Sequence, residues 1–147
     1  MLAKISEFLL GATRGFNEAE TRLLSFLMDS LPAQEREILA HQLISVRKIQ
    51  RPNPGQLVVA YYKSGDEVPR LPYLGYEHCL ANITYMSGGR VKTTSLVLHN
   101  GRFMTFERNV PQRLSDIETL RSVVLHPKGF ESVAPEIDAQ ERRVPSA

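Results

Sequence analysis

The chain lacks several features that would narrow its function. It contains 147 residues, no tryptophan and a single cysteine, Cys79. One cysteine cannot form a disulfide within the chain, so the sequence gives no sign of an oxidising compartment. No stretch approaches the roughly 20 apolar residues of a membrane-spanning helix, and Lys4 and Glu7 interrupt the apolar N-terminus, unlike a signal peptide. These absences predict a soluble, cytoplasmic protein with no membrane partner.

Catalytic and ligand-binding signatures are also missing. Gly88-Gly89 has neither the spacing of a phosphate loop nor that of a dinucleotide fingerprint. The four histidines are His41, His78, His99 and His126. None of them stands in an H-x-x-x-H or H-E-x-x-H pattern, and a strand would point adjacent His78 and Cys79 to opposite faces, where they cannot share one metal ion. With Cys79 interpreted as a small buried side chain, we predict no metal, no cofactor and no catalytic residue.

Size and composition indicate one globular domain. The chain is 42% hydrophobic and 23% charged, values that are ordinary for a globular domain of this length. We predict a single domain over residues 1–130. Residues 131–147 hold two prolines and few apolar side chains, which predicts an extended or disordered C-terminal tail.

The distribution of charge is uneven although the net charge is only +2. Residues 41–115 hold ten basic and four acidic side chains, whereas residues 1–40 and 116–147 are each net −2. Either the acidic ends fold over the basic middle, or the middle faces an anionic partner. The pI of about 8.8 is below the value of roughly 9 that is typical of nucleic-acid-binding domains, and aromatic residues do not interleave with the basic ones along the sequence. Nucleic-acid binding is therefore a secondary alternative.

Helices are expected at both ends of the chain. The apolar spacing predicts N-terminal helices over 2–12, from Asn17 to about Leu31, and from Pro32 to about Ile44. Asn17 is a good N-cap, and Glu20 follows three residues later in a capping-box arrangement. A further helix is predicted from Leu114, because Ser115 and Glu118 form a second capping box before an apolar spacing of the helical type.

The middle of the chain predicts strands. Segments rich in β-branched and aromatic residues alternate with turns, and they cover residues 46–51, 56–63, 76–86, 90–98 and 102–109. The segment 64–75 holds two prolines and two glycines, which is typical of a loop. Because helices and strands are segregated, we predict an α+β fold: two to three N-terminal helices packed on an antiparallel meander of about five strands, followed by one C-terminal helix.

Two turns fix the expected register of the sheet. Asn100-Gly101 predicts a two-residue type I′ turn, which sets His99 opposite Arg102. If Gly88-Gly89 is also a two-residue turn, His78 faces His99 on the same side of the sheet. One face then carries the core and the other stays exposed. Six side chains of interest fall on the exposed face, namely His78, His99, Arg102, Met104, Phe106 and Arg108.

Arginine, methionine and aromatic side chains are typical of protein interfaces. We therefore predict a non-catalytic, immunity- or adaptor-like protein that binds another protein through the exposed sheet face or the 64–75 loop, where Tyr73 would be an anchor. The first alternative is a small-ligand binder or enzyme with a pocket between helices and sheet. Nucleic-acid binding through the basic middle is the second, and homo-oligomerisation is a further expectation.

Overall fold

The structure is a computed structural model that describes residues 15–63, 67–73, 75–108, 114 and 116–126. The predicted helix over 2–12 and the predicted tail over 131–147 lie outside the described residues. Two helices come first along the chain, α2 (Glu18–Ser30) and α3 (Ala33–Ser45). Six strands follow, which are β1 (Val46–Gln50), β2 (Leu57–Tyr62), β3 (Glu77–Ser87), β4 (Arg90–His99), β5 (Arg102–Glu107) and β6 (Thr119–Leu125).

Helix α2 begins at the predicted cap. The side chain of Asn17 accepts a hydrogen bond from the backbone N–H of Glu20 at 2.8 Å, and the carboxylate of Glu20 accepts one from the backbone N–H of Asn17 at 2.8 Å. Both donors would otherwise be unsatisfied at the helix start. The same buried carboxylate pairs with Arg51 at 2.6 Å, so the cap also joins α2 to the end of β1.

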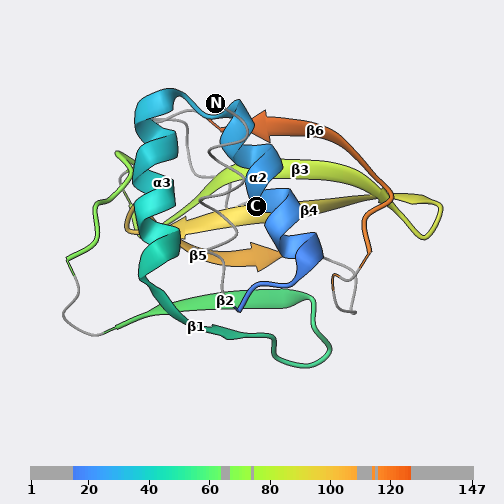
Figure 1. The fold of residues 1–147 in the computed structure, drawn as a ribbon, viewed down its shortest axis with the longest axis horizontal. Coiled ribbons are helices and arrows are strands. Elements are labelled where there is room, and N and C mark those ends of the chain that lie inside the picture. The colour runs from blue at the N-terminus through green and yellow to red at the C-terminus, as the bar shows by residue number, and fades with distance from the viewer. Residues whose placement is uncertain (1–14, 64–66, 74, 109–113, 115, 127–147) are drawn as a thin grey trace, which may run out of the picture.

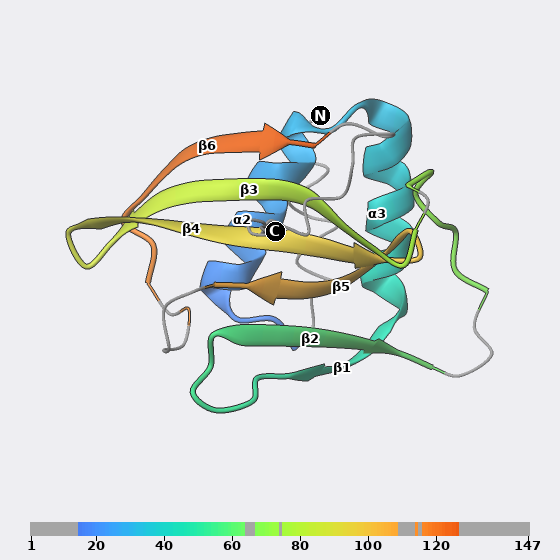
Figure 2. The same ribbon diagram turned by 180° about the vertical axis from the view of Figure 1, so that it is seen from behind.

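The strands form one antiparallel sheet in the order β1-β2-β5-β4-β3-β6. Both helices lie on the same face of this sheet, as Figures 1 and 2 show from opposite sides. The predicted α+β class is confirmed. The simple meander is not, because the consecutive pairs β1-β2 and β3-β4-β5 are joined through β2 and β5, and not through β2 and β3. Strand β2 pairs with β5, and β6 crosses to the far side of β3.

The predicted C-terminal helix is wrong. Residues Thr119–Leu125 form the edge strand β6, which pairs with β3 from Ala81 to Met86. The segment contains Thr119, Val123 and Val124, whose branched β-carbons favour a strand. Pairing with the long strand β3 satisfies backbone groups that a short isolated helix would have to satisfy itself. Pairing with β3 therefore determines the conformation of this segment, despite the local capping box that favours a helix.

The Asn100-Gly101 turn is confirmed. Both residues have positive φ, 52° and 79°, and His99 pairs with Arg102 as the type I′ turn requires. The register then shifts between Val97 and Leu98. The shift places Phe106 opposite Leu96 in the core, where it is 1% exposed, so its predicted position on the exposed face is wrong.

A second irregularity lies in β3. The pairs nearest the Gly88-Gly89 turn match the predicted register, since Met86 faces Val91. A shift between Cys79 and Ala81 then sets Glu77, and not His78, opposite His99. One extra residue moves every later side chain to the other face. His78 consequently pairs with Leu98 and is buried.

The core lies between the helices and the sheet. Leucines of α2 and α3 pack there against Tyr85, Phe103 and Phe106, all of them fully buried. Large buried side chains from both layers supply most of the favourable free energy of folding through the apolar area that they remove from water. Within the described part of the chain, neither helix has the length and apolarity needed to cross a membrane.

Candidate functional site

The face of the sheet opposite α2 and α3, here called the uncovered face, carries the candidate site. No described helix lies over it (Figure 2). Its side chains alternate with buried ones such as Ile83, Tyr85 and Leu96. Along the central strands it is formed by Cys79, Asn82, Thr84, Thr93, Ser95, Val97, Thr105 and Glu107.

Asn82 organises the polar centre of this face. Its side-chain oxygen accepts a hydrogen bond from the Ser95 hydroxyl at 2.7 Å and a weaker one from the Cys79 thiol at 3.5 Å. Its amide nitrogen lies 3.0 Å from Nε2 of His126, the residue that follows β6. The four side chains, here called the central polar cluster, thus satisfy one another across β3, β4 and the end of β6.

The protonation state of Cys79 in the central polar cluster does not favour nucleophilic attack by its thiol. Burial raises the pKa of the Cys79 thiol to about 11, which keeps it protonated and unreactive near neutral pH. Burial and the nearby His78 lower the pKa of His126, which keeps the imidazole neutral. No set of three or more His, Cys, Asp or Glu side chains among the described residues could hold a metal ion. The cluster can donate and accept hydrogen bonds.

A second group of side chains lies at the end of the sheet that carries the Asn100-Gly101 turn. We call it the hairpin-end cluster, and it consists of Lys48, Tyr61, Tyr76, His99 and Arg102. The Lys48 ammonium lies 5.8 Å from the centre of the Tyr61 ring, and the rings of Tyr76 and His99 meet edge to face at 4.2 Å. Tyr76 is 74% exposed and Tyr61 is 43% exposed. The cluster therefore combines cations with accessible aromatic surface.

Arg102 is the most constrained cation of the cluster. Its guanidinium carbon stacks 4.8 Å from the centre of the Tyr62 ring, and its Nε is buried with no hydrogen-bond partner among the described residues. The Tyr62 hydroxyl donates to the Phe103 carbonyl at 2.7 Å. Burial raises the pKa of Tyr62 well above its usual range, and Arg102 opposes this shift. Arg102 thus stands beside a neutral phenol, which does not compensate its charge.

A loop and a helix hold this end of the sheet in place. The Leu71 N–H donates to the Gly101 carbonyl at 2.8 Å, and the Arg70 guanidinium donates to the Asn100 carbonyl at 2.6 Å. From α3, the buried amide of Gln42 donates to the same Gly101 carbonyl at 3.0 Å and accepts from the Phe103 N–H at 2.9 Å. The turn is therefore a fixed platform for the hairpin-end cluster.

The structure separates the seven residues that the sequence placed at a partner site. His99, Arg102 and Met104 are partly exposed, whereas His78, Tyr73, Phe106 and Arg108 are buried.

Tyr73 and His78 form a buried stack on the helix side of the sheet. Their rings lie 4.6 Å apart, and the Tyr73 hydroxyl donates to Glu35 of α3 at 3.0 Å. Burial and the Glu35 carboxylate raise the pKa of Tyr73 to about 12. These contacts fasten the loop to α3 and to β3, so the predicted exposed anchor is a structural residue.

The partner site predicted from the sequence did not include Lys48, Tyr61 or Tyr76. The alternation in LVVAYY could have indicated Tyr61. Val58 and Ala60 point to the core, so Tyr61, the next residue, points to the opposite face. Neither family models, nor curated proteins, nor solved structures gave a match to this chain. The uncovered face and the chemistry of its residues are therefore the basis on which a function can be proposed.

Proposed function

We propose that this protein binds another protein through the uncovered face of its sheet. The observation that carries the proposal is the one-sided packing of the sheet: the described helices cover one face (Figures 1 and 2). Tyr61 on the other face and Tyr76 at the hairpin end remain exposed. Val91 and Val124 add exposed apolar surface, and their strand partners Met86 and Asn82 place them on the uncovered face as well.

The residue types support binding and not turnover. Tyrosine and arginine contribute large contact areas and are enriched among the residues that dominate interface energies. A β-sheet holds such side chains rigidly, so less conformational entropy is lost when a partner docks. The pocket alternative gains no comparable support, because the described side chains between helices and sheet form a buried apolar core around Tyr85, Phe103 and Phe106.

The proposal is tested by capturing partners from an extract of the source cells with the purified protein. Tyr61→Ala and Tyr76→Ala remove exposed rings from the hairpin-end cluster. Ile44→Ala is the matched control, because Ile44 is 48% exposed and lies on α3. We expect the double tyrosine variant to lose a partner that the wild type and Ile44→Ala retain, with affinity reduced roughly 30-fold for about 2 kcal/mol of lost anchoring.

The result must be separated from misfolding. The unfolding temperatures of the double tyrosine variant and of Ile44→Ala should agree with that of the wild type within a few degrees, because exposed side chains contribute little to stability. Retention of every captured protein by the folded double variant would overturn the proposal. Equal loss by Ile44→Ala would also overturn it, since the binding surface would then not be confined to the uncovered face.

A further inference from the structure

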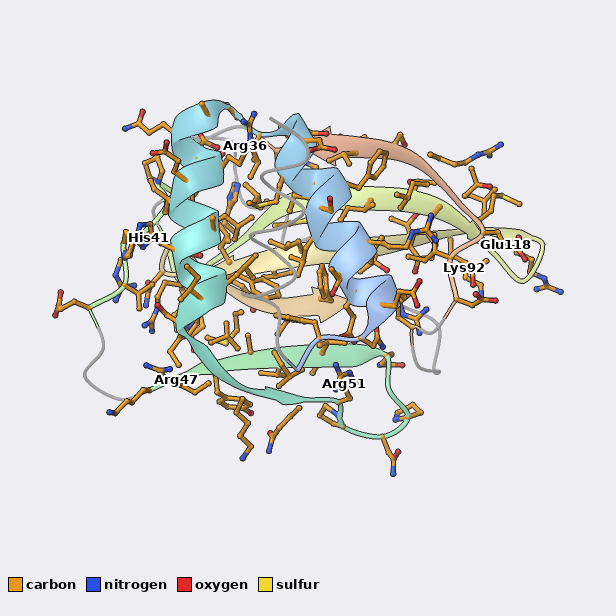
Figure 3. All side chains as sticks on the ribbon, viewed as in Figure 1. Arg36, His41, Arg47, Arg51, Lys92 and Glu118 are labelled. Carbon is orange, nitrogen blue, oxygen red and sulfur yellow. The ribbon has the colours of Figure 1, made fainter. Side chains whose placement is uncertain are left out.

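The charge at the hairpin end of the sheet has a consequence for the partner. Four basic side chains gather there: Lys48 of β1, Lys63 directly after β2, Arg70 of the 67–73 loop and Arg102 of β5. None of these four makes an ion pair within the described residues. Arg51, which directly follows β1, differs from these four because its charge is matched by Glu20 at 2.6 Å. Arg47 lies at the same end (Figure 3), but its side chain already interacts within the protein.

We propose that the partner presents an acidic segment to the hairpin-end cluster, an inference that rests on the proposed function. Carboxylates of such a segment would approach Lys48 and Arg102, and Tyr61 and Tyr76 would pack against its apolar side chains. Opposite charge across an interface steers the encounter and fixes the orientation of docking. Exposed tyrosines beside those charges supply the contact area that charges alone do not.

Arg102 is the residue that most specifically indicates an acidic ligand. Its Nε is buried and has no hydrogen-bond partner among the described residues, and a buried donor without a partner is costly. The side chain is held by its stack on Tyr62, so it is already oriented when a ligand arrives. A carboxylate accepts two parallel N–H bonds from a guanidinium. Because the Nε is buried, a partner carboxylate would bind the terminal nitrogens of the guanidinium and gain charge-assisted hydrogen bonds at little cost in side-chain ordering.

The acids at this end favour a protein over a nucleic acid as the occupant. Glu77 pairs with His99 in the row of residues that contains Arg102, and Glu67 is exposed in the neighbouring loop. A nucleic-acid strand carries a phosphate at every nucleotide, so it would be repelled where it passes Glu77. A protein segment can place a neutral or basic side chain opposite Glu77 and its carboxylates elsewhere.

Fluorescence anisotropy with three labelled probes tests the inference. The probes are poly-glutamate, a neutral glycine-serine peptide and single-stranded oligo-dT, each about ten units long. We expect poly-glutamate to bind at low ionic strength, and its dissociation constant to rise at least about tenfold at about 0.15 M salt. We expect oligo-dT to bind no more tightly than poly-glutamate, and the neutral peptide not to bind.

Charge-neutralising variants localise the binding. Lys48→Gln and Arg102→Gln should each weaken poly-glutamate binding about fivefold, which corresponds to about 1 kcal/mol. Arg90→Gln is the matched control, because Arg90 is exposed at the opposite hairpin of the sheet. It should change the dissociation constant by less than about twofold. Unfolding midpoints measured on the same samples exclude loss of folding as the cause.

Several outcomes would overturn the inference. These are absence of poly-glutamate binding, an equal effect of Arg90→Gln, and oligo-dT binding about tenfold tighter than poly-glutamate, which would identify a nucleic-acid site. Failure here is distinguishable from failure of the proposed function. If poly-glutamate does not bind but the double tyrosine variant still loses its captured partner, only the acidic chemistry is rejected.

Discussion

Gly101 is the residue of the β4–β5 turn at which a side chain would meet another segment. Its φ is 79°, and an added Cβ would lie 2.6 Å from the Leu71 carbonyl oxygen. Gly89 has a similar φ of 73°, but its Cβ would meet nothing within 4 Å. The two glycines therefore share a backbone requirement and differ in steric surroundings, which makes them a matched pair.

Replacing each glycine by alanine separates these two effects. Gly89→Ala should lower the free energy of unfolding by about 1 kcal/mol, because only the left-handed backbone disfavours the side chain. Gly101→Ala should lower it by roughly 3 kcal/mol, because the loop must also move away. Denaturant unfolding monitored by circular dichroism measures both values. Equal losses would show that the 67–73 loop is not seated against the turn.

Single residues also mark where sequence-based reasoning stops. Asn100 and Gly101 predict their turn because the signal is local, and it is confirmed. The shifts beside Leu98 and Cys79 have no comparable signal, since an inserted residue in a strand has ordinary composition. Phe106 and His78 change faces for this reason. The predicted pairing of His99 with Arg102, the residues closest to the turn, is confirmed, and their role in binding a partner stays a prediction.

At the scale of elements, Gln42 joins helix, loop and hairpin. The amide is fully buried on α3, and it donates to the carbonyls of Pro69 at 2.8 Å and Gly101 at 3.0 Å while accepting from the N–H of Phe103. Three separate segments therefore meet at one side chain. Buried polar groups of this kind specify an arrangement because each member needs the others.

Gln42→Ala is expected to lower the free energy of unfolding by about 3 kcal/mol, because the Phe103 N–H loses its acceptor inside the core. Gln34→Ala is the control on the same helix, since Gln34 is exposed, and it should change stability by less than about 0.5 kcal/mol. Chemical denaturation of both variants gives the comparison. A small effect of Gln42→Ala would mean that water replaces the amide.

Elements were predictable to the extent that their signals are local. The capping box of Asn17 and Glu20 begins α2 as predicted, and all five predicted strands exist with small shifts of their ends. The prediction for the segment after Glu118 was wrong because the conformation of this segment depends on its pairing with β3, a strand far away in the sequence. The predicted order of the strands was wrong for the same reason, since the alternation of side chains within a strand does not indicate which strands lie beside it.

At the scale of the whole molecule, stability should depend on pH through His126. Burial and the proximity of His78 lower the pKa of His126 in the folded protein. The unfolded chain therefore binds a proton at higher pH than the folded one, and the free energy of unfolding falls as pH drops below about 6.5. The loss continues until the pH reaches the folded pKa. Loosening of the β6 end, where the His126 N–H donates to Leu80, would accompany it.

His126→Gln should flatten this dependence while keeping a side chain that can accept from Asn82. His41→Gln serves as the control, because His41 is exposed on α3 (Figure 3). Urea unfolding between about pH 7.5 and 5 gives the slope for each protein. An unchanged slope in His126→Gln would assign the pH dependence to other groups.

The order of the strands also bears on how the chain reaches its fold. Strands β3, β4 and β5 are joined by two tight hairpins and can form through contacts that are close along the chain. The pairing of Leu57 with Glu107, which brings in β2 and β1, and the pairing of β6 with β3 both close long loops. Such non-local contacts raise the contact order and slow folding. We expect the three central strands to form the folding nucleus, and the hairpin-end cluster to be assembled only when β1 and β2 join it.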